Sequence, residues 1–578
     1  MARHLAQAVL ALLLMAAPAI GQQTVTLAPT SAVVVVSETQ DFTAVVTGTT
    51  QKTVRFQVCD GNGRNCVTGG SSTLGTIAEI GRDPDDNPIA RYTAPAGFPK
   101  PPTCLIVTDG CQVVVKAKLV GVKGVKTTAN AIIPVPGVLL RVGLGNDGSQ
   151  ANGFTHLPAI SADGRYVTFV SDAANLVPGD TNGKTDLFLR DTCLNAPPEC
   201  TPSTVRVSVA SDGSEANDDS NYSAISADGR YVAFESEATN LAPGVVNLGA
   251  NIFLRDTCIG APPDCVPSTL LVSETGTSIS LGGSEPSVSA NGRYVAFTAR
   301  GDNEGIFVRD TCTGAPPGCV PSTEMVSLGP DGSPADCFDD FVPCFRETTS
   351  ISADGRFVAF VSAASNWGWA VYQPQVFVRD TCRGAPGGCV PTTVYAAADT
   401  TGGASGGWCS KPRLSPDGRY VAFSSESSNL VAGDTNQQWD VFLRDTCLNG
   451  PGGCVPATWR VSVASDGVQG NAGSFWPSVS ANGRFIAFAS NAANLVGGDT
   501  NGEEDVFVRD TCLGAALGCT PTTARVSRQR KGKQANSVNR YAALTLDGRF
   551  VVFDSFASNL VADDTNGQTD VFLAATGR

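Results

Sequence analysis

The chain has 578 residues and a formal net charge of −14, with 40 Lys and Arg against 54 Asp and Glu. Such an acidic surface is poorly suited to nucleic acid or anionic lipid, whose binding depends on Lys and Arg that neutralise phosphates. The only histidines are His4 and His156; His4 lies in the predicted leader, so His-based triads, His-rich zinc sites and most general-base schemes would have to use His156.

Residues 1–21 are predicted to be a signal peptide. Arg3 supplies the charged end, 9–16 are apolar, and 19–21 resemble a small-residue cleavage site. Cleavage before Gln22 would export the protein to the periplasm or the extracellular space. Since no later segment approaches the roughly 20 apolar residues of a membrane helix, we expect a soluble protein without a membrane span, and a monomer.

Residues 22–135 are predicted to form an immunoglobulin-like β-sandwich. Short runs at 32–36, 41–46, 54–58 and 111–116 are typical of strands. The stretch Ala90-Arg-Tyr-Thr-Ala-Pro95, followed by a Val-rich strand, resembles bacterial immunoglobulin-like domains of exported proteins.

Residues 136–578 contain a repeat. A Ser-x-Asp/Asn-Gly-Arg signature, first at Ser161 to Arg165, occurs seven times at intervals of 63 to 65 residues and begins with Thr545 in its last copy. Each period contains four strand patterns, which together are typical of one propeller blade. The last period lacks a fourth strand, while 137–142 supply a solitary one before the first period. We therefore predict an all-β protein whose seven-bladed β-propeller is closed by this N-terminal strand, which hides the sheet edges.

The run Ser-Ala/Pro-Asp-Gly-Arg-Tyr-Val-Ala-Phe, followed later by Asp-Val-Phe-Val-Arg-Asp, resembles the TolB-like, WD-like propeller repeat of bacterial periplasmic proteins. The resemblance covers residues 137–578 and implies the propeller fold. TolB-type propellers typically have six blades, whereas seven periods are counted here and their loops are longer and carry cysteines. A role in the Tol-Pal envelope system therefore does not follow from the fold.

Nine cysteine pairs share a spacing of six intervening residues. We predict disulfides, because an exported chain meets an oxidising environment and a structural zinc site would need four ligands. The pairs are Cys59/Cys66, Cys104/Cys111, Cys193/Cys200, Cys258/Cys265, Cys312/Cys319, Cys337/Cys344, Cys382/Cys389, Cys447/Cys454 and Cys512/Cys519. Cys409 is left without a partner.

Four loops between second and third strands share an Asp-Thr-Asn run with a later Asp. Alternating oxygen side chains are what calcium requires, although a turn rich in Asp and Asn needs no metal. The candidate calcium ligands are Asp180, Asn182, Asp186, Asp434, Asn436, Asp440, Asp499, Asn501, Asp505, Asp564, Asn566 and Asp570. Calcium is the one cofactor that the sequence suggests.

All six tryptophans fall between positions 367 and 476. In a propeller, the loops after second and fourth strands share one face, and five of these tryptophans are expected there. Exposed aromatic rings suit stacking on sugars or anchoring a peptide; the alternative is that they fill gaps between blades. The predicted ligand-binding residues are Trp367, Trp369, Trp408, Trp439 and Trp476.

These features predict an exported, non-enzymatic binding or scaffold protein that recognises an envelope or extracellular protein, or a glycan, through one propeller face. No catalytic residue and no nucleic-acid partner are predicted. A carbohydrate-active hydrolase or lyase on the same scaffold is the alternative, because propellers host such enzymes without histidine. A purely structural surface protein is the third hypothesis.

Overall fold

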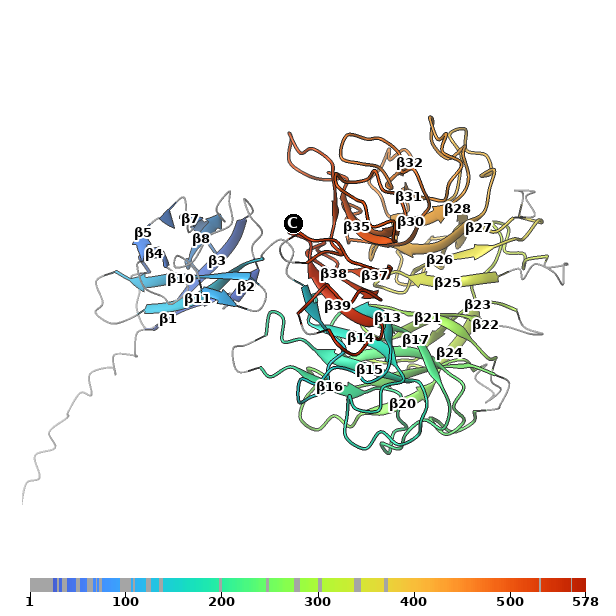
Figure 1. Ribbon diagram of the computed structural model, residues 1–578, viewed down its shortest axis with the longest axis horizontal. Coiled ribbons are helices and arrows are strands. Elements are labelled where there is room, and N and C mark those ends of the chain that lie inside the picture. Colours follow the sequence, from blue (N-terminus) through green and yellow to red (C-terminus); the bar gives the residue numbers. More distant parts are fainter. Residues whose placement is uncertain are drawn as a thin grey trace, which may run out of the picture. The chain divides into compact units, whose positions relative to one another are not determined.

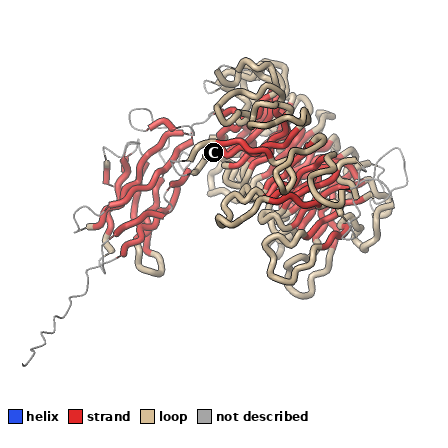
Figure 2. The backbone as a smooth tube through the Cα atoms, turned by 90° about the horizontal axis from the view of Figure 1, so that it is seen from below, coloured by secondary structure: helices blue, strands red, loops and turns tan. Residues whose placement is uncertain are grey.

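The computed structural model describes residues 24–577 except 29–30, 34–38, 48–51, 60–65, 69, 72–74, 94–104, 108–109, 121–125, 135–138, 197–199, 246–248, 275–280, 300–303, 337–344, 368–372, 530–531 and 563. In this part of the chain every regular element is a β-strand and no helix occurs (Figure 2). The chain divides into two compact units, Met1–Val135 and Pro136–Arg578. The predicted leader 1–21 lies outside the described residues.

The described part of the first unit contains two β-sheets (Figure 1). Phe42, Val58, Tyr92 and Val115 are fully buried, as expected where alternate side chains of packed sheets form a core. One sheet has the order β1 (Thr24–Ala28), β3 (Thr39–Thr47), β8 (Pro88–Thr93), β7 (Gly75–Arg82), β6 (Gly70–Ser71). The other has the order β2 (Ser31–Val33), β11 (Lys126–Pro134), β10 (Gly110–Leu119), β4 (Val54–Cys59), β5 (Val67–Thr68), with β9 (Leu105–Val107) also paired to β10.

The described part of the second unit contains seven four-stranded antiparallel sheets, numbered here by the signature that each contains. Six are formed by consecutive strands: β13 (Thr155–Ile160), β14 (Tyr166–Ser171), β15 (Asp186–Asp191), β16 (Ser203–Arg206); β17 (Ser220–Ile225), β18 (Tyr231–Ser236), β19 (Asn251–Asp256), β20 (Ser268–Leu271); β21 (Ser284–Val288), β22 (Tyr294–Ala299), β23 (Gly305–Asp310), β24 (Ser322–Met325); β25 (Phe345–Ile351), β26 (Phe357–Ser362), β27 (Gln375–Asp380), β28 (Thr392–Tyr395); β29 (Cys409–Leu414), β30 (Tyr420–Ser425), β31 (Asp440–Asp445), β32 (Ala457–Arg460); β33 (Ser474–Val479), β34 (Phe485–Ser490), β35 (Asp505–Asp510), β36 (Thr522–Arg525).

The seventh sheet joins the two ends of the unit. Its order is β12 (Leu139–Arg141), β39 (Asp570–Ala575), β38 (Phe550–Ser555), β37 (Asn539–Leu544). Leu140 of β12 faces Leu573 of β39 in the antiparallel register. The N-terminal strand therefore takes the place of the fourth strand that the last period lacks.

Each sheet packs against the next through a shared hydrophobic core. Six clusters of buried residues join neighbouring sheets, and one of them joins the seventh sheet to the first through Phe169, Phe188, Phe550 and Leu573. Figure 1 places first strands such as β13, β17, β21 and β25 toward the middle of the unit and β16, β20 and β32 at its periphery. The second unit is thus a β-propeller scaffold built from four-stranded sheets.

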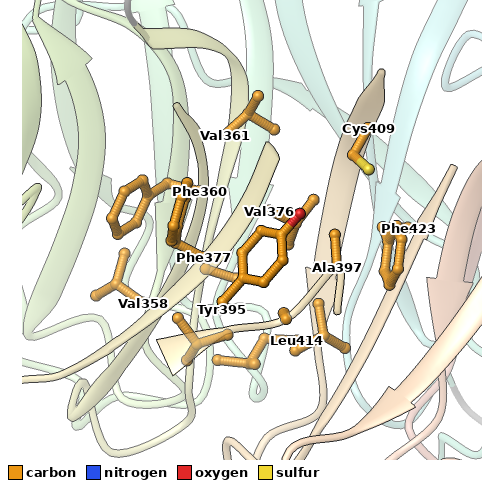
Figure 3. Packing of buried hydrophobic residues seen from close by; sticks show 14 of the residues in the cluster. Val358, Phe360, Val361, Val376, Phe377, Tyr395, Ala397, Cys409, Leu414 and Phe423 are labelled. Carbon is orange, nitrogen blue, oxygen red and sulfur yellow. The ribbon is translucent and has the colours of Figure 1, made fainter. Parts of the chain in front are cut away.

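A pair of phenylalanines recurs inside the sheets. In the fourth sheet, Phe360 and Phe377 stack with ring centroids 6.0 Å apart, and Tyr395 lies 5.5 Å from Phe377 (Figure 3). These rings come from the second, third and fourth strands, where side chains alternate between the two faces of the sheet. The repeated Val-Ala-Phe and Val-Phe patterns therefore encode the core.

The signature forms the turn between the first and second strands. Ser161 Oγ donates to Asp163 Oδ1 at 2.6 Å, and the backbone N–H groups of Arg165 and Tyr166 donate to Asp163 and Ser161 respectively. Gly164 supplies the positive φ of 82° that the turn requires. Its composition is therefore explained by folding alone.

The signature arginine also fixes the outer hairpin between the third and fourth strands. Arg165 makes two parallel hydrogen bonds to Asp191, of 2.9 and 2.7 Å, and the N–H of Cys193 donates to the same carboxylate. Equivalent pairs occur in the first six sheets. In the seventh sheet, alanine replaces the aspartate, and Arg549 instead lies 3.6 Å from Asp547.

Candidate binding site

The first strands of the seven sheets share an irregularity near the middle of the unit. Each contains a register shift of the kind called a β-bulge. In six of them the residue four positions before the signature has φ between 34° and 56°. This left-handed backbone conformation is costly for residues other than glycine. The six residues are Leu157, Tyr222, Glu285, Lys411, Trp476 and Tyr541. The bulge re-aims each of them at the cost of local strain.

The six bulge side chains line a cavity of about 300 Å³, to which all seven first strands contribute. We call this space the central cavity. Its volume is at the lower end of the range for small-ligand pockets. The signature recurs in every repeat with few changes, but the bulge position holds an aliphatic, an acidic, a basic and three aromatic residues. The central cavity therefore lacks the regularity of the fold around it.

A charged and aromatic cluster from the third, fifth, sixth and seventh sheets lines the central cavity. Lys411 Nζ lies 3.5 Å from Glu285 Oε2 and 4.8 Å from the centre of the Trp476 ring. Trp476 in turn lies 4.6 Å from the Tyr541 ring. Arg413, two residues after Lys411 on β29, also lines the cavity. An ion pair, a cation–π contact and an aromatic pair thus meet within one small space.

Acidic side chains of neighbouring second strands hold the bulges in place. The N–H of Leu157 donates to Asp554 Oδ2 at 3.4 Å, and the N–H of Glu285 donates to Glu235 Oε2 at 3.1 Å. Burial raises the pKa of Asp554 to about 7, while hydrogen bonding and the nearby Arg540 act in the opposite direction. Asp554 is only 2% exposed, so its charge state affects the packing between the seventh and first sheets.

A second cavity, of about 320 Å³, adjoins the central one. It is lined by Trp408, Trp439, Phe475 and Trp476 together with Cys409, and we call it the tryptophan cavity. Trp439 and Phe475 lie 6.0 Å apart, and Trp408 is 38% exposed. Lys411 and Trp476 line both cavities, so the two spaces share a wall.

The structure thus brings together three of the five predicted tryptophans. Trp367 is placed elsewhere: it is 4% exposed and packs edge-on against Phe377 and Phe360, with ring centroids 5.1 and 6.2 Å away. It fills the core of the fourth sheet at the repeat position that holds buried leucines in other sheets, such as Leu176 and Leu430. Trp369 lies outside the described residues.

An arginine bridges the aspartates of each predicted calcium loop. Arg206 Nη1 lies 3.2 Å from Asp186 Oδ2, and its Nη2 lies 3.7 Å from Asp180 Oδ1. The amide group of Asn182 donates to Asp186 at 3.0 Å. The other loops have the same arrangement: Asp434 and Asp440 with Arg460, Asp499 and Asp505 with Arg525, Asp564 and Asp570 with Arg141. Asn436, Asn501 and Asn566 again donate to the later aspartate.

The chain therefore supplies its own cation between these carboxylates, and calcium would have to displace it. The sequence repeats contain a signal for this arginine partner. The fourth strand carries an arginine in the four sheets that have the Asp-Thr-Asn run. In the three sheets without the run, the corresponding residue is Leu271, Met325 or Tyr395.

Seven of the nine predicted disulfides lie in the described residues. Cys59–Cys66 is in the first unit, and the outer hairpins of the first six sheets carry Cys193–Cys200, Cys258–Cys265, Cys312–Cys319, Cys382–Cys389, Cys447–Cys454 and Cys512–Cys519. The disulfides predicted for the outer hairpins are therefore present in six sheets.

The other two predicted disulfides are Cys104–Cys111 and Cys337–Cys344. Cys104, Cys337 and Cys344 lie outside the described residues. Cys111 is described only through its backbone, which belongs to β10 and lies opposite Ile133 of β11 in the antiparallel register. Both pairs therefore stay predictions from the sequence.

Cys409, the free cysteine, is buried beside Tyr395 and Phe423 at the start of β29 (Figure 3). Its Sγ lies 3.3 Å from Ser425 Oγ and 3.4 Å from Ser405 Oγ. Burial raises the pKa of the Cys409 thiol to about 11, which makes it a poor nucleophile at neutral pH.

Five charged or aromatic residues of the central cavity were not predicted as site residues: Tyr222, Glu285, Lys411, Arg413 and Tyr541. Their common feature is a fixed position before the signature, four residues before it for four of them and two residues before it for Arg413. An alignment of the seven repeats on the signature exposes both positions as irregular. Of the site residues predicted from the sequence, only Trp476 lines the central cavity.

No family model matches the chain, and no curated protein matches it. Among solved structures, TolB from Acinetobacter baumannii is 16% identical, with a TM-score of 0.32 over 71% of this chain and 76% of that one. The β-propeller domain of the Trilobed protease from Pyrococcus furiosus is 8% identical, with a TM-score of 0.39 over 73% of this chain and 95% of that one. With TM-scores below 0.5, neither likeness decides anything about this chain, whose fold is described from its own strand pairing. Within the described residues no helix is long and apolar enough to cross a bilayer.

Proposed function

We propose that this chain is an exported, non-enzymatic binding protein that recognises a glycan. In this proposal an immunoglobulin-like module precedes a seven-bladed propeller, closed by the pairing of β12 with β39. The binding face carries the loops after second and fourth strands. The six disulfides of the outer hairpins suit an oxidising compartment.

The tryptophan cavity is the observation that carries this proposal. Trp408, Trp439 and Trp476 come from three separate segments, yet they line one space together with Phe475. Aromatic walls suit the apolar face of a sugar ring, whose stacking adds to area burial. Since Trp408 stays partly exposed, a ligand can reach this wall without displacing the core.

A binding role is also better supported than hydrolysis. Glycoside hydrolysis ordinarily uses two carboxyl groups on either side of the scissile bond. Among the described residues that line the central cavity, Glu285 is the only carboxylate, and it is paired with Lys411. The carbohydrate-active enzyme therefore remains the second hypothesis, and release of reducing sugar from polysaccharides by the purified protein is its assay.

The test is a glycan array followed by calorimetry with the glycan that gives the highest signal. The double variant Trp408→Ala, Trp439→Ala should weaken binding at least about 10-fold, because buried aromatic contacts dominate such interfaces. Trp459→Ala is the matched control: Trp459 is 39% exposed on β32 and does not line the tryptophan cavity. Unchanged affinity in the double variant would remove the tryptophan cavity as the binding site.

A further inference from the structure

We infer that the central cavity binds the carboxylate of an acidic sugar residue, with Arg413 as the main contact. This inference rests on the proposed glycan binding and names the class of glycan. It assigns separate roles to the two cavities. The tryptophan cavity holds a sugar ring by stacking, and the central cavity holds the negative charge of a hexuronic acid.

Arg413 is an exception in a ring of small residues. It occupies the position two residues before the signature, and all seven residues at this position line the central cavity. The other six are Ala159, Ala224, Ser287, Ser350, Ser478 and Ala543. A small side chain is thus sufficient for folding at this position. The single arginine has room to extend into the cavity because its six counterparts are short.

The guanidinium of Arg413 has no hydrogen-bond acceptor among the described residues. Every arginine of the signature in the first six sheets, by contrast, is paired with an aspartate. Burial lowers the pKa of Arg413, and Glu285 opposes this shift. A partly buried, unpaired guanidinium is costly, and a carboxylate ligand would offset the cost with two parallel hydrogen bonds.

The charges of the central cavity favour an anion. Lys411 and Arg413 are its described cationic residues, and Glu285 is its described carboxylate. Glu285 is already paired with Lys411 at 3.5 Å, which leaves the charge of Arg413 in excess. Glu235 and Asp554 lie behind the bulges and bond to backbone N–H groups there, whereas Arg413 has no acidic partner among the described residues, so its guanidinium attracts a negatively charged group by Coulomb attraction.

The surroundings favour a sugar as the carrier of the carboxylate. Trp476 and Tyr541 form an aromatic wall, and Trp476 also faces the tryptophan cavity. Glu285 Oε2 is buried and accepts no hydrogen bond among the described residues. The two cavities share the Lys411 and Trp476 wall, and the inference places adjacent rings of one oligosaccharide on its two sides.

A matched pair of ligands tests the inference: an oligogalacturonide and its fully methyl-esterified form. The two have the same rings, but only the first carries carboxylates. We expect the mature protein to bind the acidic form about 10- to 100-fold more tightly in calorimetry, the range for hydrogen bonds to charged groups. The preference should weaken as salt is raised.

Arg413→Ser is the diagnostic variant, because it introduces a residue that the other repeats already carry at this position. It should abolish the preference and bind both ligands equally. Arg413→Lys keeps the charge without the planar fork and should retain part of the preference. Arg55→Ser, at an exposed position of β4 in the first unit, makes the same change in net charge and should leave the preference intact.

The outcomes separate the two proposals. Equal affinity of the wild-type protein for both ligands, or a preference that survives in Arg413→Ser, would overturn the carboxylate site. If the ester still binds and Trp408→Ala with Trp439→Ala weakens it, the proposed glycan binding stands without the carboxylate site. Binding of the acidic form that depends on Arg413 but not on these tryptophans would support the carboxylate site and refute the stacking role. Binding of neither ligand would overturn the carboxylate site.

Discussion

The outer hairpins and the first strands of the seven sheets differ in how strictly they repeat. In six sheets the outer hairpin has the same arginine–aspartate pair, the same disulfide and the same backbone bonds. At the bulge of the first strand the residue changes from sheet to sheet, from Leu157 to Glu285 to Trp476. A feature that every sheet needs is structural, whereas variation at a strained position facing a cavity is the mark of a binding surface. The comparison predicts that changes in the two regions affect different properties.

The largest effect is expected from the repeated core. Phe442 is fully buried and lies 5.9 Å from Phe423. Phe442→Ala should lower the free energy of unfolding by about 3–5 kcal/mol, through lost transfer energy and the cavity left behind. Denaturant unfolding followed by tryptophan fluorescence measures this change. A loss below about 1 kcal/mol would contradict the assigned core.

Removal of one outer disulfide should have the next largest effect. The double variant Cys447→Ser, Cys454→Ser should lower the free energy of unfolding by about 2–3 kcal/mol, because the loop without its disulfide has more conformational freedom in the unfolded chain. Ligand affinity should remain unchanged, since this loop lies apart from both cavities. Calorimetry on the folded variant checks this, and a 10-fold loss of affinity would place function in the outer hairpins.

The pH dependence of stability should expose the buried Asp554. Its pKa of about 7 lies above the ordinary 3.8, so the folded protein keeps a proton that the unfolded chain loses between these values. Stability should therefore fall as pH rises from about 4 to 7. In Asp554→Asn the slope should be shallower, because the side chain stays neutral and can still accept from Leu157. Thermal unfolding across this range tests it, and an unchanged slope would exclude Asp554 as a contributor.

Chelation should have the smallest effect. The aspartates of the four Asp-Thr-Asn loops already have an arginine partner, such as Arg460 for Asp434 and Asp440. A calcium ion present at 100 times its Kd would add about 2.7 kcal/mol of stability. We expect EDTA to leave the Tm unchanged within about 1 °C. A fall of several degrees that added calcium reverses would instead support the calcium prediction.

The sequence predicted the four-stranded sheets and the pairing of 137–142 with the last repeat because the strand signals are local and periodic. It also predicted the cysteine pairs of the outer hairpins. The site was harder to predict because it depends on side-chain direction. The tryptophans cluster in the sequence, but their positions alone do not distinguish Trp367, which is buried in the core, from Trp408, which is partly exposed. The bulges that turn Lys411 and Trp476 toward one space leave no local sequence signal beyond their position in the repeat.

Hydrogen exchange of the full chain, with and without the acidic oligogalacturonide, tests whether the ligand binds at the irregular first strands. We predict added protection in peptides that cover β29 and β33, which carry Arg413 and Trp476, and none in the loop between Cys447 and Cys454. Protection confined to the outer hairpins, with β29 and β33 unchanged, would contradict the assignment of binding to the irregular first strands.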